Sequence, residues 1–190
     1  MADWTASSNC GIRPYRSPHG SPQIRYYQAS TVAASTGLIR AGDVVQFDTA
    51  NSGAADWRIV RAQSTGGGGA NLLSALADKL VGIAIEAATS AGSTTGLGTQ
   101  TNRQIGVWIA DKETEFLAYL RGGGAAASSL VNKQRSLIVD STLRIWQIDS
   151  TNSTAALQTV VITEVPAAIV GDTGAQVVFK FMSSLAAPGI

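Results

Sequence analysis

The sequence predicts a mainly β fold: an antiparallel β-sandwich or barrel of about ten short strands, with one or two short helices and an extended N-terminal arm. Short runs rich in β-branched and aromatic residues recur from residue 38 onward, and clusters of Gly, Ser, Thr, Asn and Asp separate them. These runs do not alternate with long amphipathic helices, which argues against a parallel α/β architecture. A chain of 190 residues suits one domain, or one domain with an appendage.

The strand pattern is clearest in WRIVRAQ, where Trp57, Ile59 and Arg61 fall on alternate positions. The run LVGIAIEA is apolar as far as Ile85 and rich in β-branched residues, and two further pairs of runs flank short polar turns. The expected strands cover residues 43–49, 57–63 and 80–87, a hairpin at 105–121, a tighter hairpin at 136–149, and residues 158–165 and 175–182.

Helical segments are few in this sequence. Residues 71–80 place Leu72, Leu73, Leu76 and Leu80 on one helical face, and Asn71 is a suitable N-cap. Residues 126–134 give a weaker helical pattern. Residues 88–104 have no apolar periodicity, so we expect a long loop there.

The first 37 residues differ from the rest, and we expect them to form an extended arm outside a β-rich core of residues 38–190. Pro14, Pro18 and Pro22 fall in this stretch and favour extended backbone. Arginine and tyrosine, which are enriched at interface anchors, gather between these prolines and just after them. A terminus that is disordered in the isolated chain is the alternative. The residues expected to contact a partner are Arg13, Tyr15, Arg16, Arg25, Tyr26 and Tyr27.

Charge and cysteine content narrow the classes of partner. Charged residues make up 14% of the chain and the formal net charge is +1, so no global field would attract nucleic acid or an anionic membrane. Cys10 is the single cysteine, which excludes an intrachain disulfide. The first residues, MADWTASSNC, lack the pattern of a secretory signal, and no apolar run is long enough to span a bilayer. We expect no direct nucleic-acid or membrane partner.

The glycine-rich stretch STGGGGANLL resembles a phosphate-binding loop only superficially. A Walker-type loop needs a lysine and a hydroxyl residue directly after its glycines, but Ala70, Asn71 and Leu72 follow Gly69 here. A dinucleotide-binding loop needs spaced glycines inside a strand–helix–strand unit. We therefore expect a flexible connection and no nucleotide cofactor.

Catalytic and metal-binding sets are also poorly supplied. His19 is the single histidine, which leaves no rigid Ser–His–Asp relay, and zinc would need more ligands than Cys10 and His19. Asp111, Glu113 and Glu115 have the spacing to share a strand face, but their context predicts the solvated tip of a hairpin. We expect no enzyme activity, no metal and no cofactor.

Several motifs resemble those of the decoration, or cement, proteins of tailed-phage capsids. The shared elements run from residue 38 to 182 and include LIRAGDVVQFDT, LVGIA before a Ser/Gly/Thr-rich loop, IGVWIADKETEF, LIVDST and GDTGAQVVFKF. The resemblance implies a β-rich structural protein that binds the outer surface of an assembled capsid, bridges major capsid protein subunits and performs no chemistry. It also implies a homo-oligomer, a homotrimer rather than a homodimer, that joins the virion after assembly in the host cytoplasm.

Two alternatives remain open at this level. One is another virion component, such as a head–tail or tail-fibre protein. The other is a carbohydrate- or ligand-binding β-sandwich module with residues 88–104 as its specificity loop, although this loop holds no aromatic residue for stacking on a sugar.

Overall fold

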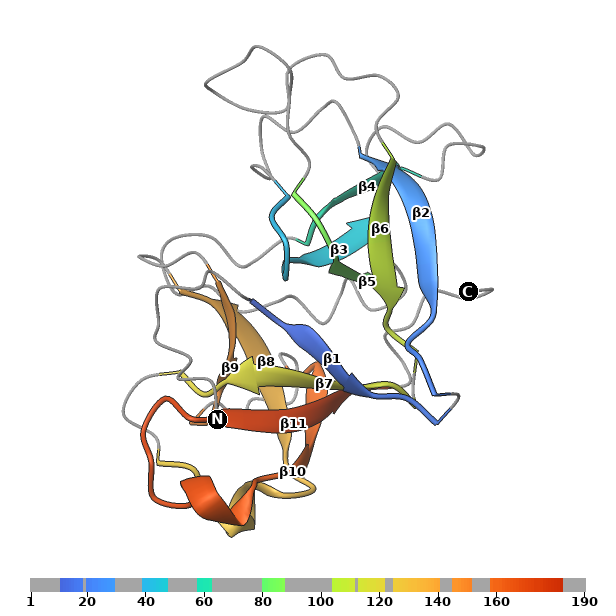
Figure 1. Ribbon diagram of the computed structural model, residues 1–190. Helices are drawn as coiled ribbons and strands as arrows, with labels where there is room; N and C mark the ends of the chain where they lie inside the picture. The colour runs from blue at the N-terminus through green and yellow to red at the C-terminus, as the bar shows by residue number, and fades with distance from the viewer. Residues whose placement is uncertain are drawn as a thin grey trace.

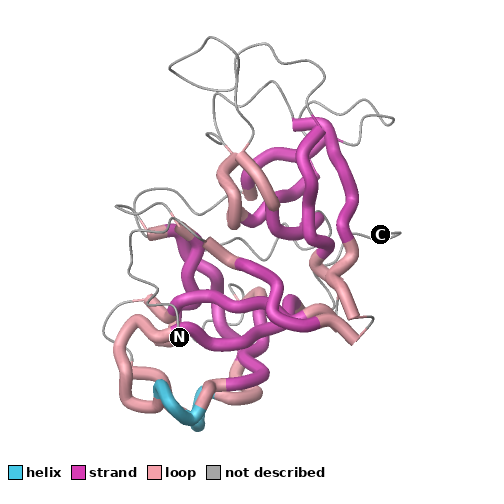
Figure 2. Tube along the Cα trace, in the orientation of Figure 1, coloured by secondary structure: helices cyan, strands magenta, loops and turns pink. Residues whose placement is uncertain are grey.

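The computed structural model describes residues 11–18, 20–29, 39–47, 58–62, 80–87, 104–111, 113–121, 125–140, 145–151 and 158–182. These residues form mainly β-strands, so the predicted fold class is confirmed. The strands group into two units, a barrel and a six-stranded sheet, and the barrel lies above the sheet in Figure 1. Figure 2 shows that the helical turns among the described residues lie at the lower end of the six-stranded unit.

The barrel is closed and its strands follow the order β2-β4-β3-β5-β6. Neighbouring strands pair antiparallel except β2 and β4, which are parallel and close the barrel. Full closure leaves few sheet edges exposed, which limits edge-to-edge aggregation. The barrel strands are β2 (Ile24–Ala29), β3 (Val44–Phe47), β4 (Arg58–Arg61), β5 (Leu80–Ala84) and β6 (Gln104–Ile109).

The second unit is a six-stranded antiparallel sheet of order β1-β7-β11-β10-β8-β9. β7 and β9 approach each other at one point, because Leu120, directly after β7, forms a parallel bridge with Ile148 of β9. The Arg121 N–H then donates to the Ile148 carbonyl at 2.8 Å. The strands are β1 (Arg13–Arg16), β7 (Glu115–Tyr119), β8 (Gln134–Val139), β9 (Trp146–Asp149), β10 (Val160–Glu164) and β11 (Gln176–Phe181).

The two units have the same topology. If β2 to β6 are matched in chain order with β7 to β11, every neighbour in the barrel has its counterpart in the second unit. The parallel contact is included, since β2–β4 corresponds to β7–β9. The second unit therefore repeats the topology of the barrel. Its β7 and β9 meet only at the Leu120–Ile148 bridge, and β1 is added at the edge of β7.

The correspondence extends to single hydrogen bonds. Gly42, before β3, has a positive φ of 82° and donates its N–H to the Ala84 carbonyl at 2.8 Å. Asn132, before β8, has a positive φ of 63° and donates its N–H to the Ile162 carbonyl, also at 2.8 Å. Ala84 and Ile162 occupy matching positions on β5 and β10. The same turn thus begins the same strand in both units.

The described residues form two hydrophobic clusters. One lies inside the barrel and includes Tyr27, Ile59 and Val107. The other lies within the second unit and extends to barrel residues, so that Phe116 and Trp146 share a cluster with Ile83. The barrel and the six-stranded sheet are therefore joined by apolar packing.

The predicted hairpins had different outcomes. Residues 136–149 form the expected hairpin, since β8 and β9 pair antiparallel. The expected hairpin at 105–121 is wrong, because β6 pairs within the barrel and β7 within the six-stranded sheet. The reason is packing. Ile105 is buried inside the barrel, whereas Phe116 packs against Phe179 and Phe181 of β11.

The prediction that residues 1–37 form an arm outside the core is also wrong, although the backbone is extended, as predicted, at β1 and β2. Strand β1 pairs with β7, and β2 pairs with both β4 and β6, so this segment supplies one strand to each unit. Figure 1 shows it passing from one unit to the other. Tyr27 and Ala29 are buried, and that burial outweighs the arm-like composition. Removing residues 1–37 would therefore open the barrel.

The described residues contain no α-helix. Residues 126–134 form a short 3-10 helix, Ser128–Leu130, before β8, and a second one covers Ala167–Ile169. The helix expected at 71–80 lies outside the described residues except for Leu80, which begins β5.

Candidate interaction surface

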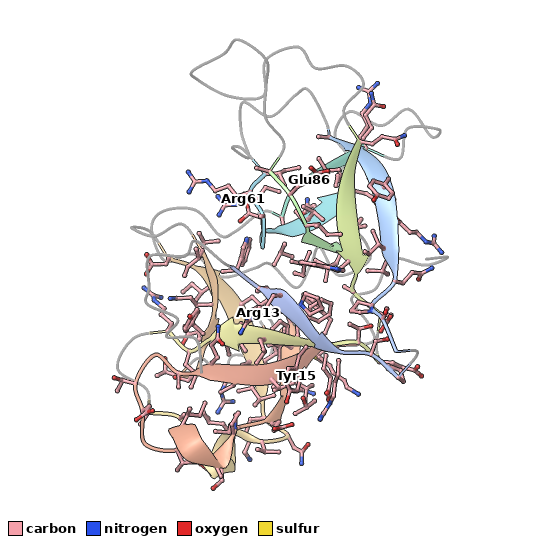
Figure 3. All side chains as sticks on the ribbon, viewed as in Figure 1. Arg13, Tyr15, Arg61 and Glu86 are labelled. Carbon is pink, nitrogen blue, oxygen red and sulfur yellow. The ribbon has the colours of Figure 1, made fainter. Side chains whose placement is uncertain are left out.

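The six residues predicted to contact a partner lie on the two consecutive strands that the N-terminal segment contributes. Arg13, Tyr15 and Arg16 are on β1, and the other three are on β2. Figure 3 shows Arg13 and Tyr15 on β1 where it crosses the six-stranded unit. All six predicted residues are therefore parts of folded strands.

On β1, the Arg13 side chain contacts the sheet, whereas Tyr15 and Arg16 are exposed to solvent. Arg13 Nη2 donates to Gln176 Oε1 on β11 at 3.2 Å, so this arginine is engaged within the sheet. Tyr15 is 47% exposed. The Arg16 guanidinium lies 5.4 Å from the centroid of the Tyr15 ring, which is a cation–π arrangement. Tyr15 and Arg16 therefore form a combined aromatic and basic surface at the end of β1.

Arg16 also belongs to an ion-pair network that crosses four adjacent strands. Its Nε pairs with Glu115 Oε2 on β7, and its Nη2 lies 3.3 Å from Glu164 Oε2 on β10. Lys180 Nζ on β11 lies 3.8 Å from Glu115 Oε1. The hydrogen bond to Glu115 is the main cause of the raised pKa of Arg16. This network fixes the position of β1 on the sheet and limits the freedom of Arg16 to bind a partner.

The acidic cluster at residues 111–115 is not the solvated hairpin tip that the sequence predicted. Asp111 caps a turn, because its carboxylate accepts hydrogen bonds from the Glu113 and Thr114 N–H groups and, at 2.8 Å, from Thr114 Oγ1. Glu115 is 5% exposed and carries the ion pairs of the network. The three acids therefore do not share one face for a cation.

On β2, two of the three predicted residues are exposed. Arg25 is exposed and Tyr26 is 67% exposed. Tyr27 is only 7% exposed and packs edge-on against Phe47, with ring centroids 5.8 Å apart. Burial raises the pKa of Tyr27, and nearby Arg25 acts against that rise. The prediction for Tyr27 is therefore corrected: its ring belongs to the barrel core and is closed to a partner.

Sequence reasoning missed a buried charge at the junction of the two units. Asp43, in the GDVV motif, is 2% exposed, and its Oδ2 lies 3.2 Å from Arg61 Nε and accepts the Arg40 N–H at 2.8 Å. The Arg61 guanidinium lies 5.9 Å from the Trp146 ring on β9. Burial raises the pKa of Asp43 to about 6, against the opposing effect of Arg61. Figure 3 shows Arg61 on the barrel side of this junction.

Other groups considered from the sequence give no site here. Within the described residues, no set of three or more His, Cys, Asp or Glu side chains is placed to hold a metal ion. Over the same ranges, no helix has the length and apolar character to cross a membrane. The glycines Gly66–Gly69, Cys10 and His19 lie outside the described residues, as does the loop expected at 88–104 except for Gln104, which begins β6.

Comparisons with protein-family models, with curated proteins and with solved structures found no match to this chain.

Proposed function

We propose that this protein is a structural component of a phage virion that binds the outer surface of the capsid and stabilises it by bridging major capsid protein subunits. It acts without chemistry or cofactor, as a homo-oligomer, with a homotrimer favoured over a homodimer. The motif resemblance over residues 38–182 supports this role: the VVQF part of its GDVVQF motif forms β3, and the aspartate of that motif pairs with Arg61.

The observation that carries the proposal is the exposed aromatic and basic surface on β1 and β2. Tyr15 and Tyr26 are 47% and 67% exposed, and Arg16 and Arg25 lie beside them along the chain. Exposed aromatic and arginine side chains on rigid strands give contact area at small entropic cost, which suits a permanent partner. A capsid surface is such a partner.

Co-sedimentation with empty heads of the phage that carries the gene tests the proposal. We expect wild-type protein to pellet with the heads and to raise the temperature at which they disrupt. The double variant Tyr15→Ala/Tyr26→Ala should bind at least ~10-fold more weakly, since each aromatic anchor contributes about 1–2 kcal/mol. Val170→Ala is the control, because Val170 is 51% exposed directly after the 3-10 helix Ala167–Ile169 and lies on neither β1 nor β2. Wild-type protein that stays in the supernatant would refute the proposal.

A further inference from the structure

Although the two units share one topology, they differ at one strand edge: β1 covers this edge in the second unit, and no described strand covers its counterpart in the barrel. In the second unit, the first half of β7 does not reach β9, and β1 pairs with it there: Arg13 lies opposite Leu117 and Arg16 opposite Glu115. In the barrel, β2 meets β4 only at its end, through Gln28 and Ala29. The first half of β2 is therefore the counterpart of the edge that β1 covers.

The backbone of this half strand is oriented for pairing. Ile109 N–H donates to the Gln23 carbonyl at 2.9 Å, which sets the alternation of hydrogen bonds between β2 and β6. The backbone N–H and C=O groups of Arg25 therefore point toward β6. Those of Ile24 and Tyr26 point away from β6. Within the part of the chain that the structure describes, no strand pairs with Ile24 or Tyr26 on that side.

The side chains at this edge are also unlike those of a protected edge. Ile24 is 47% exposed and Tyr26 is 67% exposed, two of the large apolar side chains that the described surface presents to solvent. Natural sheet edges are usually protected by proline, charge or a covering segment. Strand β1 follows that rule in part, because Pro14, next to the paired Arg13, has no N–H to offer a further strand.

We propose that the β2 edge at Ile24–Tyr26 binds an extended strand from a different polypeptide, added antiparallel as β1 is added to β7. This goes beyond the proposed function and does not depend on it. The bound segment has an apolar residue opposite Ile24, an acidic residue opposite the exposed Arg25, and an apolar residue opposite Tyr26. Main-chain hydrogen bonds supply affinity, and the acidic residue between two apolar ones supplies selectivity.

A second copy of this chain is a poorer occupant of the same edge. An antiparallel pairing that joined Ile24 of one copy to Tyr26 of the other would place the two Arg25 side chains directly opposite each other. Like charges opposite each other across strands are destabilising. The counterpart contact in the second unit is instead complementary, since Arg16 pairs with Glu115. Charge therefore favours a partner that is not this chain.

Full-length protein titrated with a short synthetic peptide of alternating valine and glutamate tests the proposal, with amide hydrogen exchange measured by NMR. We expect the Ile24 and Tyr26 amides to exchange quickly in the free protein and at least ~10-fold more slowly with the peptide, as edge pairing requires. The Arg25 amide, already bonded to β6, should change little. A peptide of alternating valine and lysine should bind at least ~10-fold more weakly.

Two variants separate backbone pairing from side-chain contact. Tyr26→Pro removes the outward N–H without removing a bond to β6 and should abolish peptide binding. Tyr26→Ala keeps the N–H and should only weaken it. The proposal is overturned if the peptide leaves the two amides unprotected at millimolar concentration, or if Tyr26→Pro binds as wild type. It is also overturned if the amides become protected without peptide as protein concentration rises, because the occupant would then be a second copy.

Discussion

Gly42 and Asn132 occupy the same place in the two units: each has a positive φ, and each donates its N–H at 2.8 Å to the matching carbonyl of the next strand but one. Two unrelated residue types meet one backbone requirement, because glycine and asparagine tolerate the left-handed region best. The requirement comes from the turn that starts β3 and β8. The topology is therefore encoded in the turn as well as in the strands.

Alanine substitutions at these two turns should differ in cost. Asn132→Ala places an ordinary side chain at positive φ and should reduce the free energy of unfolding by about 1 kcal/mol. Gly42→Ala should cost more, about 3 kcal/mol, because its Cβ would also lie 2.6 Å from Gly11 Cα. Urea denaturation measures both, with Asn132→Gly as a control that should be neutral or stabilising. Equal losses for the two alanine variants would contradict the close contact with Gly11.

Gly82 in the centre of β5 should tolerate no side chain. A Cβ there would lie 1.9 Å from the Trp108 carbonyl oxygen of β6, so the barrel backbone would have to move. We expect Gly82→Ala to lower the free energy of unfolding by about 3 kcal/mol or more. Gly106→Ala is the matched control, since its Cβ would meet the flexible end of Ile85 at 3.1 Å and should cost about 1 kcal/mol or less. A thermal shift assay that ranks the two variants in the opposite order would count against the observed β5–β6 contact.

Much of the β architecture could be predicted from the sequence, because apolar alternation and turn residues are local signals. The runs around Val45, Ile83 and Phe179 are strands as expected. Strand pairing was harder, since β6 and β7 are close in sequence but pack in different units. The partner of a strand is decided by contacts between residues far apart in the sequence, and local residue patterns do not reveal these contacts.

Neither the repeat of the topology nor the burial of Asp43 could be predicted from the sequence, and the reasons differ. QIGVWI in β6 and QVVFKF in β11 share their first residue and their apolar pattern, but their loops differ, which hides the repeat. The sequence around Asp43 is typical of an exposed turn. Asp43 is buried nonetheless, because Arg61, which is distant in the sequence, pairs with it. The arm prediction is wrong because it gives the arginines and prolines more weight than the alternation of Tyr27 and Ala29.

Stability should depend on pH through Asp43. Its pKa is about 6 in the folded protein, against 3.8 for an unperturbed aspartate, so between these values the folded state holds a proton that the unfolded chain has lost. The free energy of unfolding therefore falls as pH rises through this window, by up to about 3 kcal/mol. Asp43→Asn removes the titrating group, and its denaturation midpoint should be flatter over about pH 4–7 than that of wild type. Identical pH profiles for the two proteins would show that Asp43 does not titrate in this range.

The Glu115 network should hold β1 on the sheet by charge. Glu115 has a side chain only 7% exposed and pairs with Arg16 and Lys180, so Glu115→Gln leaves two cations facing a neutral amide. We expect a loss of about 1–2 kcal/mol in the free energy of unfolding and faster amide exchange along β1. Glu164→Gln is the matched control, because the Glu164 side chain is 37% exposed and pairs with Arg16 Nη2 at 3.3 Å, so its loss should stay within about 0.5 kcal/mol. Exchange along β1 that is the same in both variants would mean that the backbone ladder, and not the buried carboxylate, holds the strand.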